Sequence, residues 1–313
     1  MGKMKTLLRI CKESPNELGH AISVNLSRNY LSRLIPDKLY LKIQYRLNLG
    51  EKLNLKKPIT YNAKLQWIKL YDRKPEYTKL VDKYKVRDFV KNKIGEEYLI
   101  PMLGAWKSFE EIDFNMLPNQ FVLKCNHDSG SVVICKDKET FDYDGAKKRL
   151  TKALKRNMYF FGREWPYKNV KSCIIAEKYL VDDENTNNDN LTDYKIYCFG
   201  GVPKVVMLAS DRFADTEAHF DYVDEHFNWL DMEWGHPKSL EKPKKPKMFD
   251  EMLRLARILS EGFAQIRVDF YESNGKVYFG EMTFFDGSGF EPITPYEWDI
   301  KMGEWINLPQ KNI

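Results

Sequence analysis

Residues 265–289, QIRVDFYESNGKVYFGEMTFFDGSG, decide the fold because they predict a β-hairpin that carries two acidic residues. The runs IRVDFY and KVYFGEM alternate and are rich in aromatic and β-branched residues, as strands are. Asn274 and Gly275 lie between them, and this dipeptide is a strong signal for a tight turn. Asp269 lies in the first run and Glu281 in the second.

The length of the turn decides what these two acids can do together. With a two-residue turn, Val268 pairs with Glu281, and Asp269 and Glu281 point to opposite faces of the sheet. With a three-residue turn and a bulge, Asp269 pairs with Glu281, and the two carboxylates lie a few ångströms apart. The sequence leaves both possibilities open.

A close carboxylate pair needs a neutralising cation, because two bare carboxylates repel each other. Oxygen ligands of this kind suit Mg²⁺, which keeps its other contacts for water and phosphate. Arg267 shares a face with Asp269 and is suited to binding an anion. The alternative is an ordinary solvent-facing hairpin, although the Gly-rich stretch that follows favours a functional site.

The composition is that of a folded globular protein, with 43% hydrophobic and 30% charged residues. The net charge of +5 is uneven, since residues 1–57 contain twelve Lys or Arg and only four Asp or Glu. This basic region predicts an anionic partner, such as a membrane surface or a polyanionic substrate, with a solvated helical face as the alternative. Five cysteines without a CxxC pair, and no run of 18 apolar residues, predict a cytoplasmic protein without a spanning helix.

Two further stretches predict binding groups. Residues 77–94 have the periodicity of one amphipathic helix, whose Lys83, Lys85 and Arg87 read as solvated. In FVLKCNHDSGSVVIC (residues 121–135), a polar loop joins two strand-like runs, and such a loop can turn its N–H groups toward phosphate oxygens. Lys124, in the first run, needs an anionic partner if it is buried. A plain hairpin loop is the alternative.

Later segments complete the expected elements. Residues 173–176 predict a buried strand leading to Glu177, and residues 193–199 and 204–209 predict a hairpin with Lys195 on its first strand. Residues 248–263 have the apolar stripe of a helix that packs on a core. Scattered histidines show no metal-ligand spacing, and nothing resembles a nucleic-acid stacking motif, so no nucleic-acid partner is expected.

Six stretches, in order, resemble the ATP-grasp superfamily, and within it the TupA-like branch associated with teichuronopeptide and surface-polysaccharide synthesis. They are PITYNAKLQWIKLYDR, LVDKYKVRDFV, IGEEYLIPMLGAW, FVLKCNHDSGS, DYKIYCFGG and RVDFYESNGKVYFGEMTFFDGSG. The resemblance implies an α+β ATP-grasp fold, with two α/β lobes whose antiparallel sheets clasp ATP, after a short helical N-terminal region. It implies a basic helical region over residues 1–57, an ATP-binding lobe over 58–180, and a second lobe with the Mg²⁺-binding hairpin over 181–313.

The resemblance also implies a role for each matching residue. Asp269 and Glu281 would hold Mg²⁺, and Arg267 and Lys195 would act on the reacting groups. The nucleotide would be bound by a wider set: Lys83, Lys124, Asn126, His127, Ser129, Gly130, Ser131, Glu177, Lys178 and Lys195. Many relatives have an Asn two residues after the last metal ligand, where this chain has Thr283. Many also have an N-terminal βαβ substrate domain, and here that region is short, basic and helical.

The resemblance implies a carboxylate–amine ligase that uses ATP and Mg²⁺ and joins an amino acid to a sugar acid. A sugar kinase of the same fold, and a non-catalytic nucleotide- or glycan-binding partner of glycosyltransferases, are the alternatives. The expected partners are an acceptor with a carboxylate and an amine donor. The expected location is the cytoplasm, with peripheral association at the inner membrane face through residues 1–57.

Overall fold

The computed structural model describes residues 15–181, 191–210 and 218–311, so the first 14 residues of the basic N-terminal region lie outside the described residues. By its internal contacts the chain divides into two compact units. Unit 1 comprises Met1–Arg73, Tyr159–Trp165 and Phe285–Ile313, and unit 2 comprises Lys74–Met158 and Pro166–Phe284. The predicted division into three consecutive regions stays a prediction.

Unit 1 is mainly helical. Its helices are α2 (Pro15–Arg28), α3 (Asp37–Leu49), α4 (Tyr61–Tyr71), α8 (Tyr159–Gly162) and α10 (Tyr296–Glu304), with 3₁₀ turns η1 (Tyr30–Leu34) and η6 (Asp286–Gly289) and the short strand β11 (Ile293–Thr294). α2 packs on α3, and α10 packs on α4. The Thr60 side chain caps α4 by accepting the backbone N–H of Ala63.

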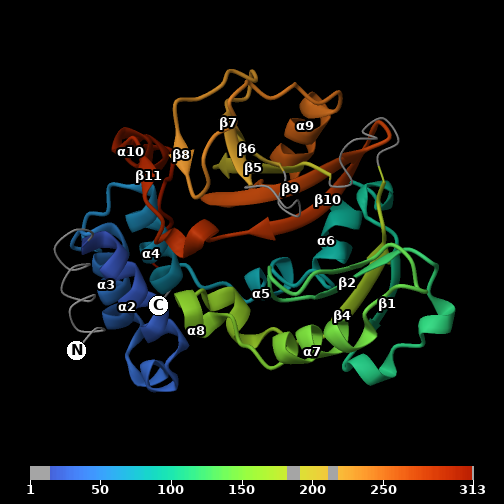
Figure 1. The fold of residues 1–313 in the computed structure, drawn as a ribbon. Coiled ribbons are helices and arrows are strands. Elements are labelled where there is room, and N and C mark those ends of the chain that lie inside the picture. The colour runs from blue at the N-terminus through green and yellow to red at the C-terminus, as the bar shows by residue number, and fades with distance from the viewer. Residues whose placement is uncertain (1–14, 182–190, 211–217, 312–313) are drawn as a thin grey trace. The chain divides into compact units, whose positions relative to one another are not determined.

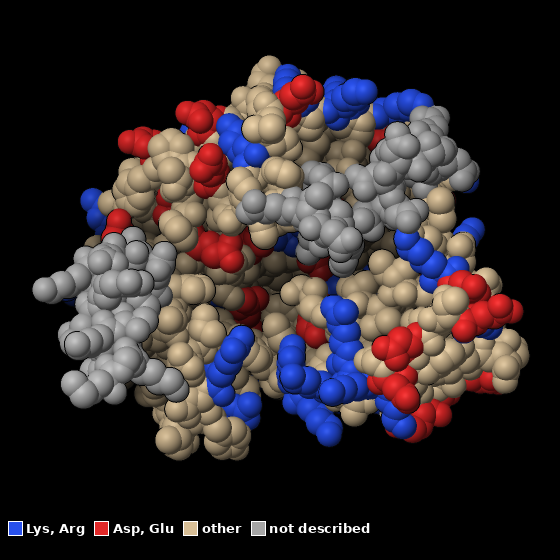
Figure 2. All heavy atoms as spheres, viewed as in Figure 1, with Lys and Arg blue, Asp and Glu red and all other residues tan. Residues whose placement is uncertain are grey.

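Unit 2 contains a four-stranded antiparallel sheet, called here the small sheet (Figure 1). Its order is β1 (Met102–Trp106), β4 (Ile174–Lys178), β2 (Phe121–Cys125) and β3 (Val133–Cys135). One face packs against α7 (Tyr143–Leu154), where Leu123, Ala176 and Leu150 share a buried apolar cluster. Alternation along β2 therefore turns Lys124 to the opposite face. The other face of α7 is basic, and Figure 2 shows Lys and Arg side chains gathered over it.

Unit 2 also contains a five-stranded antiparallel sheet, called here the large sheet. Its order is β10 (Lys276–Thr283), β9 (Gln265–Ser273), β5 (Asp193–Phe199), β6 (Val202–Ser210) and β7 (His219–Val223), and strand β8 (Glu233–Trp234) follows β7 in the chain. α9 (Phe249–Leu259) packs its buried stripe on β5, β6 and β9, as the apolar periodicity predicts. The mixed α+β composition with antiparallel sheets agrees with the expected fold class.

Two helices and four 3₁₀ turns complete unit 2, and they correct one prediction. The turns are η2 (Glu96–Tyr98), η3 (Phe109–Glu111), η4 (Phe114–Met116) and η5 (Trp165–Asn169), of which η5 begins in unit 1. The prediction of a single helix over residues 77–94 was wrong, because the chain forms two helices there, α5 (Tyr77–Leu80) and α6 (Val86–Lys93). The break has a local cause, since the Asp82 carboxylate accepts the backbone N–H groups of Tyr84 and Lys85.

Candidate active site

The hairpin of β9 and β10 brings the two predicted metal ligands to one face by a route that the sequence did not predict. Its turn is the two-residue one, with Asn274 at φ 51° and Gly275 at φ 69°. Such positive values at both central residues are typical of a type I′ turn. In a regular hairpin this turn would place the two acids on opposite faces.

A β-bulge in β10 restores the shared face. Phe270 pairs with Phe279 and Val268 pairs with Met282, so Asp269 alone lies opposite two residues, Gly280 and Glu281. A Cβ on Gly280 would lie 3.1 Å from the Tyr271 ring and 3.2 Å from the Asp269 carbonyl oxygen. Glycine therefore lets the two strands approach closely at the bulge.

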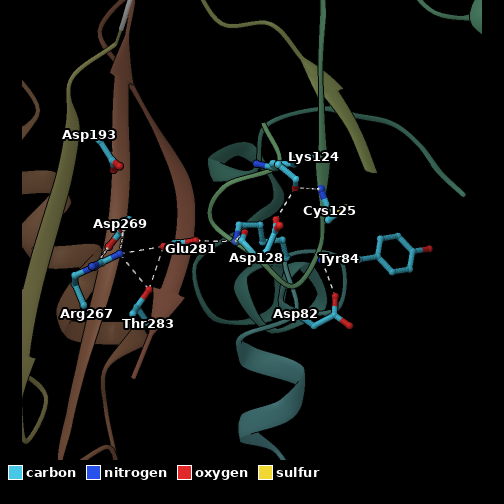
Figure 3. A network of polar contacts seen from close by, with 12 residues as sticks. Asp82, Tyr84, Lys124, Cys125, Asp128, Asp193, Arg267, Asp269, Glu281 and Thr283 are labelled. Carbon is cyan, nitrogen blue, oxygen red and sulfur yellow. Dashed lines mark hydrogen bonds and ion pairs between the residues drawn. The ribbon is translucent and has the colours of Figure 1, made fainter. Parts of the chain in front are cut away.

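Arg267 joins the two carboxylates, as Figure 3 shows. Its Nε and Nη2 each donate to Asp269 over 2.7 Å, and Nη2 also donates to Glu281 over 3.0 Å. Thr283 is the residue that stands where many relatives have Asn. Its hydroxyl lies 3.2 Å from Nη2 and donates to Glu281 over 3.1 Å. Three side chains thus offer hard oxygens around one guanidinium.

Lys195 reaches the same cluster from β5, where it lies opposite Asp269 in register. Its Nζ donates to Asp269 over 2.6 Å and also to Asp193. Burial disfavours the charged lysine, but Asp193 and Asp269 outweigh it and hold the pKa of Lys195 above its ordinary value. Asp193 is a member of the cluster that the sequence analysis missed, although its spacing of two from Lys195 in a strand places both on one face.

Lys83 supplies a third cation. Its Nζ lies 2.8 Å from Glu281 Oε2 and donates to the Asp128 carbonyl oxygen of the polar loop over 2.8 Å. Lys83 is therefore not solvated, and it links the loop to the large sheet. Burial favours the neutral Glu281, but Lys83, Arg267 and Lys195 together hold its pKa well below the ordinary value. At Asp269 burial is the largest effect, and it raises the pKa against the opposing charges of Arg267 and Lys195.

On the small sheet a separate cluster forms around Glu177. Lys124 Nζ lies 2.5 Å from one oxygen of Glu177, and Arg87 Nη1 lies 3.3 Å from the other. Glu177 is thus the anionic partner that a buried Lys124 needs, and Arg87 is a second member of this site that was wrongly expected to be solvated. Lys178, the next residue of β4, is exposed and takes no part in either cluster.

The polar loop at 126–131 has fixed sides and an exposed tip. The side-chain amide of Asn126 donates to Asp82 over 2.8 Å, and its oxygen accepts the N–H of Cys173 over 2.9 Å. Ser131 accepts the N–H of Cys125 over 2.8 Å and donates to Asp128. A further side-chain contact, from His127 Nε2 to the Arg156 carbonyl oxygen, spans 3.1 Å.

The exposed tip of this loop consists of Ser129 and Gly130. The other predicted nucleotide ligands of the loop, Asn126, His127 and Ser131, are buried and hold its frame. Their contact with nucleotide stays a prediction. The structure therefore leaves the tip, rather than the whole loop, accessible from outside.

A model of the TupA-like ATP-grasp family matches residues 63–307 of this sequence, which is most of the chain. The chain belongs to this family. The match confirms the resemblance and the ATP-grasp fold that the sequence predicted. A search of curated proteins returned no significant match.

Solved ATP-grasp ligases are structurally similar to this TupA-like chain. One is D-alanine–D-alanine ligase from Bacillus anthracis complexed with ATP (14% identity, TM-score 0.37, covering 66% of this chain and 54% of that one). Another is the ATP-grasp ligase PsnB complexed with a minimal precursor, Mg and ADP (12%, TM-score 0.36, covering 80% and 65%). A third is D-alanine–D-alanine ligase from Helicobacter pylori (14%, TM-score 0.35, covering 73% and 61%). The TupA-like chain spans less than two thirds of the length of these structures.

The donor set of the TupA-like chain fits a magnesium ion. Asp269, Glu281 and Thr283 converge on the Arg267 guanidinium, so a cation already bridges the two carboxylates. Among the described residues there is no group of three or more His, Cys, Asp or Glu arranged to hold a metal. A two-carboxylate site suits Mg²⁺, which takes few protein ligands and keeps water and phosphate oxygens.

Proposed function

We propose that this chain is an ATP- and Mg²⁺-dependent carboxylate–amine ligase. The observation that carries the proposal is the bulged hairpin, which presents Asp269 and Glu281 side by side with Arg267 and Lys195 around them. Membership of the ATP-grasp family supports ATP as the substrate of this site. Asp269 and Glu281 would hold Mg²⁺, which would neutralise charge on the phosphates of ATP.

The proposed reaction has two steps. A carboxylate oxygen of the sugar acid attacks the γ-phosphorus of ATP, and the bond to the bridging oxygen breaks to release ADP. The amine of the amino acid then attacks the acyl carbon, phosphate leaves, and an amide forms with loss of one amine proton. Phosphoryl transfer depends on positioning and charge neutralisation, which two buried cations and a carboxylate pair supply.

Several of the predicted residues have a place in this proposal. Arg267 binds the acceptor carboxylate or the transferred phosphoryl group, because a planar guanidinium matches both bidentately. Lys195 steadies Asp269 and reaches toward the nucleotide. Lys124 exchanges its contact with Glu177 for the α- and β-phosphates, and the tip of the polar loop closes over them. Glu177 then accepts from the ribose or adenine.

The proposed setting is the cytoplasm, where ATP and a sugar-acid precursor of a surface polysaccharide such as a capsule meet. The acceptor carries a carboxylate and the donor an amine. The family supports the nucleotide half of this proposal. The acceptor half rests on the sequence resemblance alone. None of the helices in the described part of the chain has the length and apolarity to cross a bilayer.

Thermal unfolding with and without Mg-ATP tests the nucleotide site. Ligand at about 100 times its dissociation constant adds about 2.7 kcal/mol to the free energy of unfolding, which raises the melting temperature by several degrees. We expect this rise in the wild type and in Asp231→Asn, whose carboxylate is fully exposed. We expect its loss in Asp269→Asn, and an unchanged rise in that variant would contradict the metal assignment.

Product analysis tests the reaction. The protein is incubated with Mg-ATP, uronic acids labelled with ¹⁸O in the carboxylate, and a mixture of amino acids. A ligase transfers one ¹⁸O atom to phosphate and forms an amide only when the amine is present. A sugar kinase forms a phosphorylated sugar without the amine, and a binding protein consumes no ATP in any mixture, so each alternative has its own signature.

A further inference from the structure

Unit 1 carries an apolar surface that neither the nucleotide nor the acceptor chemistry uses. In η1, Tyr30, Leu31 and Leu34 are 72%, 67% and 81% exposed. Leu31 and Leu34 are three residues apart in a 3₁₀ turn, so their side chains lie one above the other and project in the same direction. Large apolar side chains that are this exposed and adjacent mark an interaction surface more often than scattered ones do.

The turn that presents these side chains is held firmly from the other side. Ser32, between the two leucines, is buried, and its carbonyl oxygen accepts from Arg163 Nη2 over 2.7 Å. Arg163 itself is only 1% exposed and lies over the ring of Tyr40 at 4.1 Å. The exposure of Leu31 and Leu34 is therefore a property of an anchored turn and not of a frayed end.

The segment that contains the turn is rich in exposed basic residues. In residues 18–50 the basic side chains are all exposed: Arg28, Arg33, Lys38, Lys42 and Arg46. The one acidic residue in this range, Asp37, is half-buried and paired with Arg73 over 2.8 Å and with Arg163 over 3.3 Å. Arg33 lies over the Tyr30 ring at 4.4 Å, so a cation sits beside the apolar tip.

We propose that the surface formed by η1 and its basic neighbours, called here the anchor surface, binds the face of an anionic lipid bilayer. Leu31, Leu34 and Tyr30 enter the boundary between head groups and acyl chains. The surrounding Lys and Arg contact lipid phosphates. This combination of apolar and basic side chains is typical of peripheral membrane anchors.

A bilayer fits this surface better than a protein partner for two reasons. The leucines protrude from a turn, whereas a docking groove for a protein helix is concave. The exposed cations nearest the turn in sequence, Arg28, Arg33 and Lys38, have no exposed acidic residue between them, and lipid phosphates are complementary to such a basic segment. The anchor surface is independent of the proposed ligase activity, because none of its residues belongs to the two ion clusters.

Co-sedimentation of the full-length protein with vesicles tests this inference. We expect binding to vesicles of phosphatidylcholine with 30% phosphatidylglycerol, weak binding to phosphatidylcholine alone, and loss of binding at high salt. Leu31→Ser/Leu34→Ser should weaken binding by ~10-fold or more, since it removes the side chains that insert. Leu240→Ser is the matched control, because Leu240 is 99% exposed but lies in unit 2.

A second pair of variants tests the contribution of the basic residues. Arg28→Gln/Lys38→Gln should weaken binding to anionic vesicles, whereas Lys148→Gln/Lys152→Gln, which removes two charges from α7, should leave it unchanged. Equal binding by the wild type and the double serine variant would overturn the proposal. So would a concentration-dependent dimer that the double serine variant abolishes, because the surface would then bind a second copy.

The Mg-ATP stabilisation of the same variants separates this proposal from the proposed function. Vesicle binding with no Mg-ATP effect would leave the anchor surface standing and contradict the ligase. A Mg-ATP effect without vesicle binding would leave the ligase proposal standing and contradict the anchor surface.

Discussion

The two ion clusters of unit 2 differ in their balance of charge. Around Glu177 on the small sheet, one carboxylate faces two cations, Lys124 and Arg87. On the large sheet, three carboxylates, Asp193, Asp269 and Glu281, face two cations of the same sheet, Arg267 and Lys195. A third cation, Lys83, contacts Glu281 from outside the sheet and balances the charge. The small-sheet cluster, called here the positive cluster, has a surplus of positive charge, which suits phosphates. The large-sheet cluster, called here the negative cluster after its three carboxylates, offers the oxygens that suit a metal ion.

The largest expected effect comes from the negative cluster. Asp269→Asn should lower ATP-dependent turnover by about 10²–10³-fold, because it removes charge that acts directly on the reacting groups. Steady-state ATP consumption at saturating Mg²⁺ measures the loss, with Asp231→Asn as the control. Turnover within twofold of the wild type would mean that the negative cluster is structural.

Gly280→Ala tests the bulge that brings the negative cluster together. The added Cβ meets the Tyr271 ring and the Asp269 backbone, so we expect unfolding to become easier by about 1–3 kcal/mol. Urea unfolding measures the change. Gly130→Ala is the control, since nothing lies within 4 Å of a Cβ built there. Equal stability of the two variants would show that the strands can separate at the bulge without cost.

The positive cluster should give a smaller effect. Lys124→Met removes one of two cations from the small sheet, and we expect KM for ATP to rise about 10-fold with a smaller change in kcat, since a binding contact is lost. Arg87→Met, which leaves Lys124 with Glu177, should raise KM less. If Arg87→Met had the larger effect on KM, the roles of the two cations would be exchanged.

The smallest expected effect concerns the frame of the polar loop beside the positive cluster. Burial lowers the pKa of His127 below its ordinary value of 6.5, so the unfolded chain binds a proton more readily than the folded one. The contribution of His127 to stability is therefore fully present above pH 6.5 and is lost as the pH falls below that value. We expect the wild type to lose more stability than His127→Asn between pH 7 and pH 5. Parallel curves in thermal unfolding would contradict the buried neutral imidazole.

The sequence predicted the elements of the negative cluster better than their geometry. Alternation and the Asn274-Gly275 turn were enough to locate β9 and β10. The bulge could not be predicted, because the register of a hairpin depends on cross-strand contacts such as that of Gly280 with Tyr271, which are distant in sequence. Glu281 therefore lies beside Asp269 because the two-residue turn is combined with a bulge in β10.

The two cations that reach the clusters from the segment of α5 and α6 were harder to predict. Lys83 and Arg87 lie four residues apart, and this spacing on a regular helix is typical of a solvated face. The contacts of Asp82 with Tyr84 and Asn126 interrupt the helix and redirect these side chains inward. Ion pairs between distant elements, such as Arg87 with Glu177, have no signal in local periodicity. The family resemblance found Lys124 and Glu177 but not Arg87.

The bulge in β10 has a consequence for insertions and deletions in this chain. Removing Gly280 would make the hairpin regular, and the side chains of β10 on either side of the deletion would keep their pairing with β9. Glu281 would then lie directly opposite Asp269, so the two acids would stay on one face. If β10 instead kept its length but paired without the bulge, Gly280 would lie opposite Asp269 and Glu281 would turn to the other face. The site therefore tolerates a shorter strand better than a shifted one.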